Sequence, residues 1–160
     1  MSNLFINIGI DIEHIKKINF DYWNTSNVKN MDSMFSGLED IIELDLSSFN
    51  TSNVTDMTEM FNGCAALKEL NLSNFNTSNV ISMSDMFINC ESLTSLDLSS
   101  FDISNTLDMY QMFAGCPKLK AIKLSDKWKI REDTDIDGMF NGCRHLSNID
   151  FSGFSIRPDD

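Results

Sequence analysis

The sequence repeats itself every 26 residues over most of its length. Three complete copies follow one another without a gap, beginning at Phe49, Phe75 and Phe101. An earlier copy begins at Trp23 and a later one at Trp128, after a one-residue insertion. One unit of this size cannot bury its own apolar face, so a fixed period of this length predicts a fold built by stacking similar units.

The copies divide the chain into a single domain made of a cap, five repeats and a tail. The N-terminal segment holds a degenerate half-copy, in which Ile12, Ile15, Ile18 and Phe20 match the spacing of the repeat leucines. We interpret this segment as a cap over the exposed core of the first repeat. The predicted units are the cap 1–22, the repeats 23–48, 49–74, 75–100, 101–127 and 128–153, and the truncated sixth copy 154–160.

Each repeat combines two hydrophobic periods. In the second copy, five residues have the spacing of one face of a helix, namely Val54, Met57, Met60, Phe61 and Cys64. The preceding asparagine column, with Asn53 as its member here, suits a helix N-cap, and Asp56 would place negative charge at the helix N-terminus. Alternation at 67–72 then predicts a short strand. The predicted fold class is an α/β solenoid with one short helix and one short parallel strand per repeat.

The leucines and the longer repeat phrase resemble a known family. The motif Leu67-x-x-Leu70-x-Leu72 is similar to the core of a leucine-rich repeat. The phrase FNTSNVTDM…MF.GC..L..L.LS resembles the BspA-like class, a repeat of bacterial surface proteins that is also common in mycoplasma lipoproteins. The resemblance extends from Trp23 to Gly153. It implies adhesion or protein binding through the sheet face, and it brings no catalytic residues.

Charge and hydropathy exclude several classes of partner. The 160 residues include 24 acidic and 12 basic side chains, for a net charge of −12. This balance argues against direct nucleic-acid binding and against docking on anionic lipid. The longest apolar runs are too short for membrane insertion, and the start MSNLFINIGIDIEH lacks the features of a signal peptide. We therefore expect an unexported, cytoplasmic protein, whereas the family context favours the cell surface.

The sequence offers few candidate catalytic or metal-binding residues, so we expect neither an enzyme nor a cofactor. The two histidines, His14 and His145, lie far apart along the predicted stack. The four cysteines share one column, which predicts buried free thiols, with disulfides between successive repeats as the alternative. The run from Asp133 to Gly138 reads D-x-D-x-D-G, like the opening of a calcium loop, but Arg144 occupies the position of the bidentate glutamate. We interpret these acids as helix N-terminal charges.

The predicted binding surface is the exposed face of the strands, where residues vary between copies of a constant framework. Its charge is predicted to change from acidic in the first strands to basic in the fourth. The partner-binding residues that we predict are Glu43, Asp45, Glu69, Asn71, Asp97, Lys120 and Lys123.

Three hypotheses follow for the function of the chain. The first is a protein-binding scaffold of the adhesion or interaction type. The second is an acidic intracellular inhibitor, such as an immunity protein or phage antagonist, that blocks the basic site of a nuclease or nucleic-acid-binding enzyme. The third is a structural role, in which the open end of the stack forms an end-to-end homodimer. The alternative interpretation is that the exposed strand face needs no partner and is an ordinary solvated surface that keeps the protein soluble.

Overall fold

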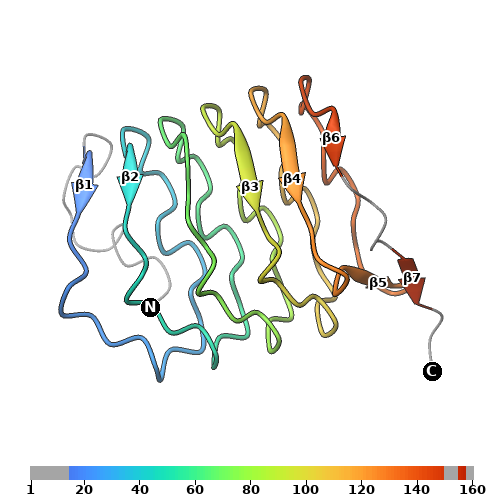
Figure 1. Cartoon of the computed structure of the whole chain (residues 1–160), viewed down its shortest axis with the longest axis horizontal. Helices are drawn as coiled ribbons and strands as arrows, with labels where there is room; N and C mark the ends of the chain where they lie inside the picture. The colour runs from blue at the N-terminus through green and yellow to red at the C-terminus, as the bar shows by residue number, and fades with distance from the viewer. Residues whose placement is uncertain (1–14, 150–154, 158–160) are drawn as a thin grey trace.

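The computed structural model of the chain describes residues 15–149 and 155–157. Each repeat forms one coil, and successive coils lie side by side along the long axis of the molecule (Figure 1). The bridges and backbone hydrogen bonds between neighbouring coils join residues about one repeat apart. The sequence predictions for Ile12, His14 and Phe154 lie outside the described residues.

Short parallel strands occupy one side of the coils. β1, β2, β3, β4 and β6 follow one another along the stack, while β5 and β7 pair near the C-terminal end (Figure 1). β1 pairs with β2, and β3, β4 and β6 form a second sheet. The strand bounds are β1 Lys17–Ile18, β2 Glu43–Leu44, β3 Ser95–Asp97, β4 Ala121–Lys123, β5 Lys129–Arg131, β6 Asn148–Ile149 and β7 Ser155–Arg157.

The opposite side of each coil differs from the sequence prediction, because no residue in the described ranges is helical. The segments predicted as helices consist of consecutive turns. In these turns alternate residues donate to the carbonyl three positions earlier, as Met60 does to Met57 at 3.2 Å. The residues between them donate to the next coil instead, as Phe61 does to Met86 at 2.9 Å. We call these lateral bonds, made by four residues per coil, the turn ladder.

Left-handed residues explain why no helix forms. Glu59 and Gly63 have φ angles of 52° and 71°, and every repeat has residues with positive φ at the same two places. A right-handed helix cannot continue through such residues, each of which costs a non-glycine side chain about 1–2 kcal/mol. Gly63, like Gly37 and Gly115 in the same column, removes that cost. The lateral hydrogen bonds of the turn ladder compensate for the strain at Glu59.

The core runs the length of the stack between the turns and the strands. The side chains predicted to face inward in the second copy are fully buried, as are their equivalents in the third and fourth repeats. The phenylalanines of the Met-Phe pairs stack on one another with ring centroids 5.4–5.6 Å apart. This aromatic ladder consists of Phe35, Phe61, Phe87, Phe113 and Phe140.

The asparagine column links coils and does not cap helices, which corrects the sequence prediction. The side-chain amide of Asn53 donates to the carbonyl of Ser26 in the preceding coil at 2.7 Å. Asp56, predicted to lie at a helix N-terminus, accepts the backbone N–H of Thr58 at 3.0 Å and so closes a turn. Both residue types satisfy backbone groups, as a cap would, but they stabilise the stack and its turns.

Candidate functional site

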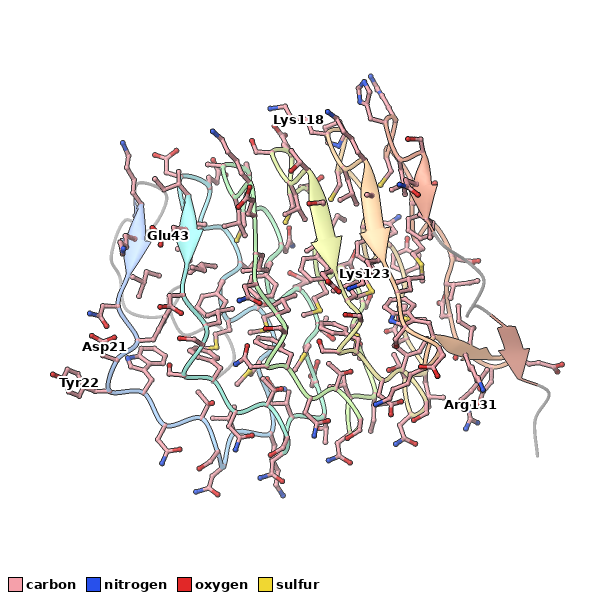
Figure 2. All side chains as sticks on the ribbon, in the orientation of Figure 1. Asp21, Tyr22, Glu43, Lys118, Lys123 and Arg131 are labelled. Carbon is pink, nitrogen blue, oxygen red and sulfur yellow. The ribbon has the colours of Figure 1, made fainter. Side chains whose placement is uncertain are left out.

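The predicted partner-binding residues all lie on the strand side and are all exposed. Glu43 lies on β2, Asp97 ends β3, and Lys123 ends β4. Figure 2 shows Glu43 and Lys123 well separated along the stack. The face is therefore an elongated surface, and the seven residues do not converge on one point.

Three of these residues also have a structural role. Asp45, Asn71 and Asp97 each accept the backbone N–H of the serine two positions later, at 3.0–3.1 Å. Such side-chain turns end the strand and direct the chain back toward the core. Hydrogen bonds from Ser47 lower the pKa of Asp45. For Asp97, the hydroxyl of Ser99, followed by the ammonium of Lys123, lowers the pKa to about 2.

Ion pairs offset part of the predicted charge gradient. At one end Lys17 Nζ lies 3.4 Å from Glu43 Oε2, and farther along the stack Lys123 Nζ lies 2.9 Å from Asp97 Oδ2. Both pairs join neighbouring strands, and both are solvent-exposed, so each contributes little stability. Glu69 lies between them and has no ion-pair partner among the described residues. The exposed Lys68 directly precedes Glu69 in the chain, so the strand face of the second repeat carries charges of both signs.

The same repeat interrupts the sheet. No strand forms at 68–72, and across the described residues the backbone N–H groups of Lys68, Glu69, Leu70 and Asn71 donate no hydrogen bond. Glu43 and Glu69 are one period apart, so their carboxylates occupy neighbouring positions of one column. Like charges at such positions destabilise strand pairing. This repulsion opposes pairing between β2 and the 68–72 segment.

An open depression of about 740 Å³ lies across this interruption. It is lined by β2, the 68–72 segment and β3, and it brings together the predicted residues Glu43, Glu69, Asn71 and Asp97. Asp45 lines neighbouring smaller pockets, whereas Lys120 and Lys123 on the far side of β3 do not line the depression. We call this surface the repeat-two depression.

Sequence reasoning missed two apolar contributors to the repeat-two depression. The side chain of Ile42 is 57% exposed, and Leu70 is half-buried although its equivalents Leu44 and Leu96 are buried. The doublet Ile41-Ile42 was the available signal, because it breaks the alternation expected of a strand. The depression therefore combines carboxylates with exposed apolar surface, a composition suited to binding another macromolecule.

A family model matches the chain over residues 1–122 and again over residues 39–154. Its description is "Mycoplasma protein of unknown function, DUF285". The chain belongs to this family. Comparison with curated proteins and comparison with solved structures both gave no match.

The other candidate sites of this DUF285 chain have structural explanations. The four cysteines are free, and each Sγ lies 3.0–3.3 Å from a phenylalanine carbonyl oxygen in the preceding coil. Burial raises the pKa of Cys64 to about 12 and that of the half-buried Cys143 to about 11. Thiols with such pKa values are poor nucleophiles and poor metal ligands at neutral pH.

The predicted calcium-loop residues do not converge on one point. Asp133 forms a two-bond ion pair with the guanidinium of Arg131, at 2.8 and 3.0 Å. Asp135 accepts the backbone N–H of Asp137 at 2.9 Å. Within 15–149 and 155–157, no group of three or more histidine, cysteine or acidic residues is arranged to hold a metal ion, and no helix could cross a membrane.

Proposed function

We propose that this chain is a non-enzymatic protein-binding scaffold of the BspA-like leucine-rich-repeat type, a solenoid that binds its partner through the strand face. The observation that carries the proposal is the repeat-two depression. Exposed Ile42 and half-buried Leu70 supply apolar contact there, and Glu43 and Glu69 supply charge. Interfaces commonly combine an apolar centre with polar surroundings that set specificity.

A second function, the acidic inhibitor, is favoured by a different observation. The net charge is −12, and Glu69 has no ion-pair partner among the described residues. A basic nucleic-acid-binding site on a partner enzyme would complement this field and associate rapidly at low salt. The two functions use the same surface but differ in the share of binding free energy that comes from charge.

Capture of the partner tests the site. The biotinylated chain is crosslinked in lysate and in a surface-protein extract of the source cells, beside the double variant Glu43→Lys, Glu69→Lys. The matched control is Glu39→Lys, Glu91→Lys, which makes the same charge change at exposed residues outside the depression. We expect wild type and control to capture the same protein and the depression variant to lose it. Capture by all three, or by none, contradicts the proposal.

Salt dependence then separates the two functions. For an acidic inhibitor, we expect the affinity for the captured partner to fall steeply between about 0.05 and 0.5 M salt, because screening weakens charge attraction. For a scaffold that binds around Ile42 and Leu70, we expect a shallow dependence and a large loss of affinity in Ile42→Ser. A steep salt slope with no effect of Ile42→Ser would favour the inhibitor.

A further inference from the structure

Three large apolar side chains are exposed on the turn side of the third and fourth repeats. Ile81 is 50% exposed, and Leu107 and Tyr110 are each 40% exposed. Both repeats have a described coil on either side, so this exposure does not depend on how the stack ends. We call the surface formed by these three residues the turn-side patch.

Backbone contacts hold the three residues of the turn-side patch together. The N–H of Leu107 donates to the carbonyl of Ile81 in the neighbouring coil at 2.9 Å, so the two residues occupy adjacent positions of one column. Tyr110 follows three residues after Leu107, across a turn that Asp108 closes by accepting the N–H of Tyr110 at 3.0 Å. The patch therefore spans two neighbouring coils.

The repeat does not require apolar residues at these positions. The column of Ile81 and Leu107 holds lysine or threonine in the other repeats, and the column of Tyr110 holds aspartate, threonine or serine. These polar members are Lys29, Thr55 and Thr134 in the first column, and Asp32, Thr58, Ser84 and Asp137 in the second. Stacking is therefore compatible with a polar surface here. An exposed apolar patch that the framework does not need is typical of an interaction site.

Carboxylates lie within and beside the turn-side patch. Asp108 accepts the hydroxyl of Ser82 in the neighbouring coil at 3.4 Å. Partial burial raises the pKa of Asp85, and the charges of Glu59 and Asp108 raise it further, so the three carboxylates lie near one another. Residues 69–117 contain no lysine or arginine, and none of the three carboxylates has an ion-pair partner among the described residues.

The charge of the turn-side patch restricts what can cover it. In the fifth repeat, Asp135 forms a β-bridge with Asp108 and, like Asp137, is exposed. Toward the other end, Lys29 lies two coils before Ile81 in the same column. A purely apolar partner would remove water from the carboxylates without replacing its hydrogen bonds, which costs free energy. A favourable partner must bring cations together with its apolar contacts.

We propose that the turn-side patch is a second interaction surface, separate from the strand face, and that it binds a basic amphipathic segment of another protein. Apolar residues of that segment cover Ile81, Leu107 and Tyr110, and lysines or arginines beside them pair with the surrounding carboxylates. The same charges repel nucleic acid and anionic lipid. They also disfavour a second copy of this chain, whose net charge is −12.

Peptide binding to the full chain, followed by fluorescence anisotropy, tests this proposal. The probe is a labelled peptide of leucine and lysine at the spacing of an amphipathic helix. One control peptide has the same composition without that spacing, and the other has glutamate in place of lysine. We expect the probe to bind at least about 10-fold more tightly than either control, because one control lacks the apolar strip and the other lacks the cations.

A triple variant tests the apolar contact with residues that other repeats place in the same columns, so its folding should be retained. The variant is Ile81→Thr, Leu107→Thr, Tyr110→Ser. The matched control is Ile42→Thr, which removes a 57% exposed apolar side chain from the strand face. We expect the triple variant to bind the probe at least about 10-fold more weakly and the control to bind it like wild type. Equal binding by all three proteins, or an equal loss in the control, would overturn the proposal.

A charge variant tests the cationic part of the partner. Glu59→Gln, Asp108→Asn introduces neutral residues that occur in the same columns of other repeats, and Glu39→Gln, Glu91→Gln removes the same charge outside the turn-side patch. In about 0.05 M salt we expect the first variant to bind the probe roughly 5-fold more weakly than the second. Equal affinities, or equal binding of the glutamate peptide, would overturn the proposal. Sedimentation showing dimers that the triple variant loses would assign the patch to a second copy and would also overturn it.

Discussion

The turn side and the strand side of the stack arise from the same repeat but differ in regularity. On the turn side each of the first four coils makes four lateral backbone bonds to the next coil, without interruption. On the strand side, the described strands form separate sheets, and residues 68–72 belong to none of them. The turn side buries its repeated side chains, whereas the strand side exposes the residues that vary.

This difference shows where a repeat protein can tolerate variation. The turn ladder depends on backbone geometry and on a buried column that scarcely changes between copies. Strand pairing depends also on exposed neighbours such as Glu43 and Glu69, which can repel each other without disturbing the core. The candidate binding surface therefore lies where the framework is least regular, and the turn side holds the molecule together.

The largest expected effect is a difference in unfolding free energy between a substitution on the turn side and one on the strand side. Phe87 is fully buried and stacks on Phe61 and Phe113, so Phe87→Ala should cost about 3–5 kcal/mol of unfolding free energy. Leu70 is half-buried beside the unpaired segment, so Leu70→Ala should cost only about 1 kcal/mol. Urea unfolding followed by circular dichroism measures both values. Equal losses would contradict the view that the turn side dominates stability.

A smaller effect tests the geometry of the turn ladder. Gly63 and Gly115 share a φ of +71°, so alanine is strained equally at both. A Cβ at Gly115 would clash with Asn89 Oδ1 and lie 3.2 Å from the Asn89 backbone nitrogen, whereas at Gly63 the nearest atom is 3.8 Å away. We expect losses of about 2–3 kcal/mol for Gly115→Ala and about 1 kcal/mol for Gly63→Ala.

Thermal and urea unfolding of the two alanine variants give the measurement, with wild type as the reference. Because the strain is common to both sites, the difference between the variants reports the close packing of neighbouring coils. Indistinguishable variants would mean that the coils separate easily at this point, and the turn side would then be no tighter than the strand side.

The core columns could be predicted from the sequence, but the local structure of the turn side could not. Hydrophobic spacing showed which residues face inward, and Met57, Met60 and Phe61 are indeed fully buried. The same spacing fits an α-helix and a series of turns, because it shows which way the side chains point and not which carbonyl each backbone N–H group bonds. On the turn side these carbonyls belong to the next coil, so the pattern within one repeat cannot identify them.

The strand face was predicted correctly as exposed, but its internal differences were not. The Asp-Leu-Ser and Asn-Leu-Ser sequences at 45–47, 71–73 and 97–99 could have indicated side-chain turns. The interruption at 68–72 and the depression around it depend on which side chains become neighbours after stacking. The partners of Glu43 illustrate this, since it pairs with Lys17 on one side and faces Glu69 on the other.

A third prediction concerns the cysteines, which share one column of the repeat beside the turns. Burial raises the pKa of Cys64 from 9.0 to about 12. A group whose folded-state pKa is raised contributes its stability below the unfolded pKa and loses it as pH rises toward the folded value. We expect a loss of about 1.4 kcal/mol per pH unit above pH 9 for this thiol.

Comparing Cys64→Ala with wild type isolates that contribution from the titration of lysines and tyrosines. The variant is less stable at pH 7, but its stability should fall less steeply between pH 8 and pH 10 in urea titrations. Parallel curves for the two proteins would show that the thiol ionises freely in the folded state, and hence that the turn side is open to water.

The smallest expected effect belongs to the strand side. Hydrogen bonds from Ser99 and the ion pair with Lys123 lower the pKa of Asp97 from 3.8 to about 2. A lowered pKa contributes stability above pH 3.8 that is lost as pH falls through about 2. The side chain is exposed, so Asp97→Asn should cost less than about 1 kcal/mol at pH 7 and should flatten the stability curve between pH 4 and pH 2.

Asparagine is the informative substitution because Asn71 closes the same turn in the preceding repeat, so the backbone bond from Ser99 is retained while the charge is removed. The control is Glu91→Gln, which also removes one exposed acidic charge but breaks no ion pair among the described residues. It should leave the stability curve between pH 4 and pH 2 unchanged. A loss of several kcal/mol in Asp97→Asn would show that the exposed strand residues stabilise the stack as strongly as the turn side does. Their variation between repeats would then reflect structural demands, and the strand face would no longer be the natural place for partner specificity.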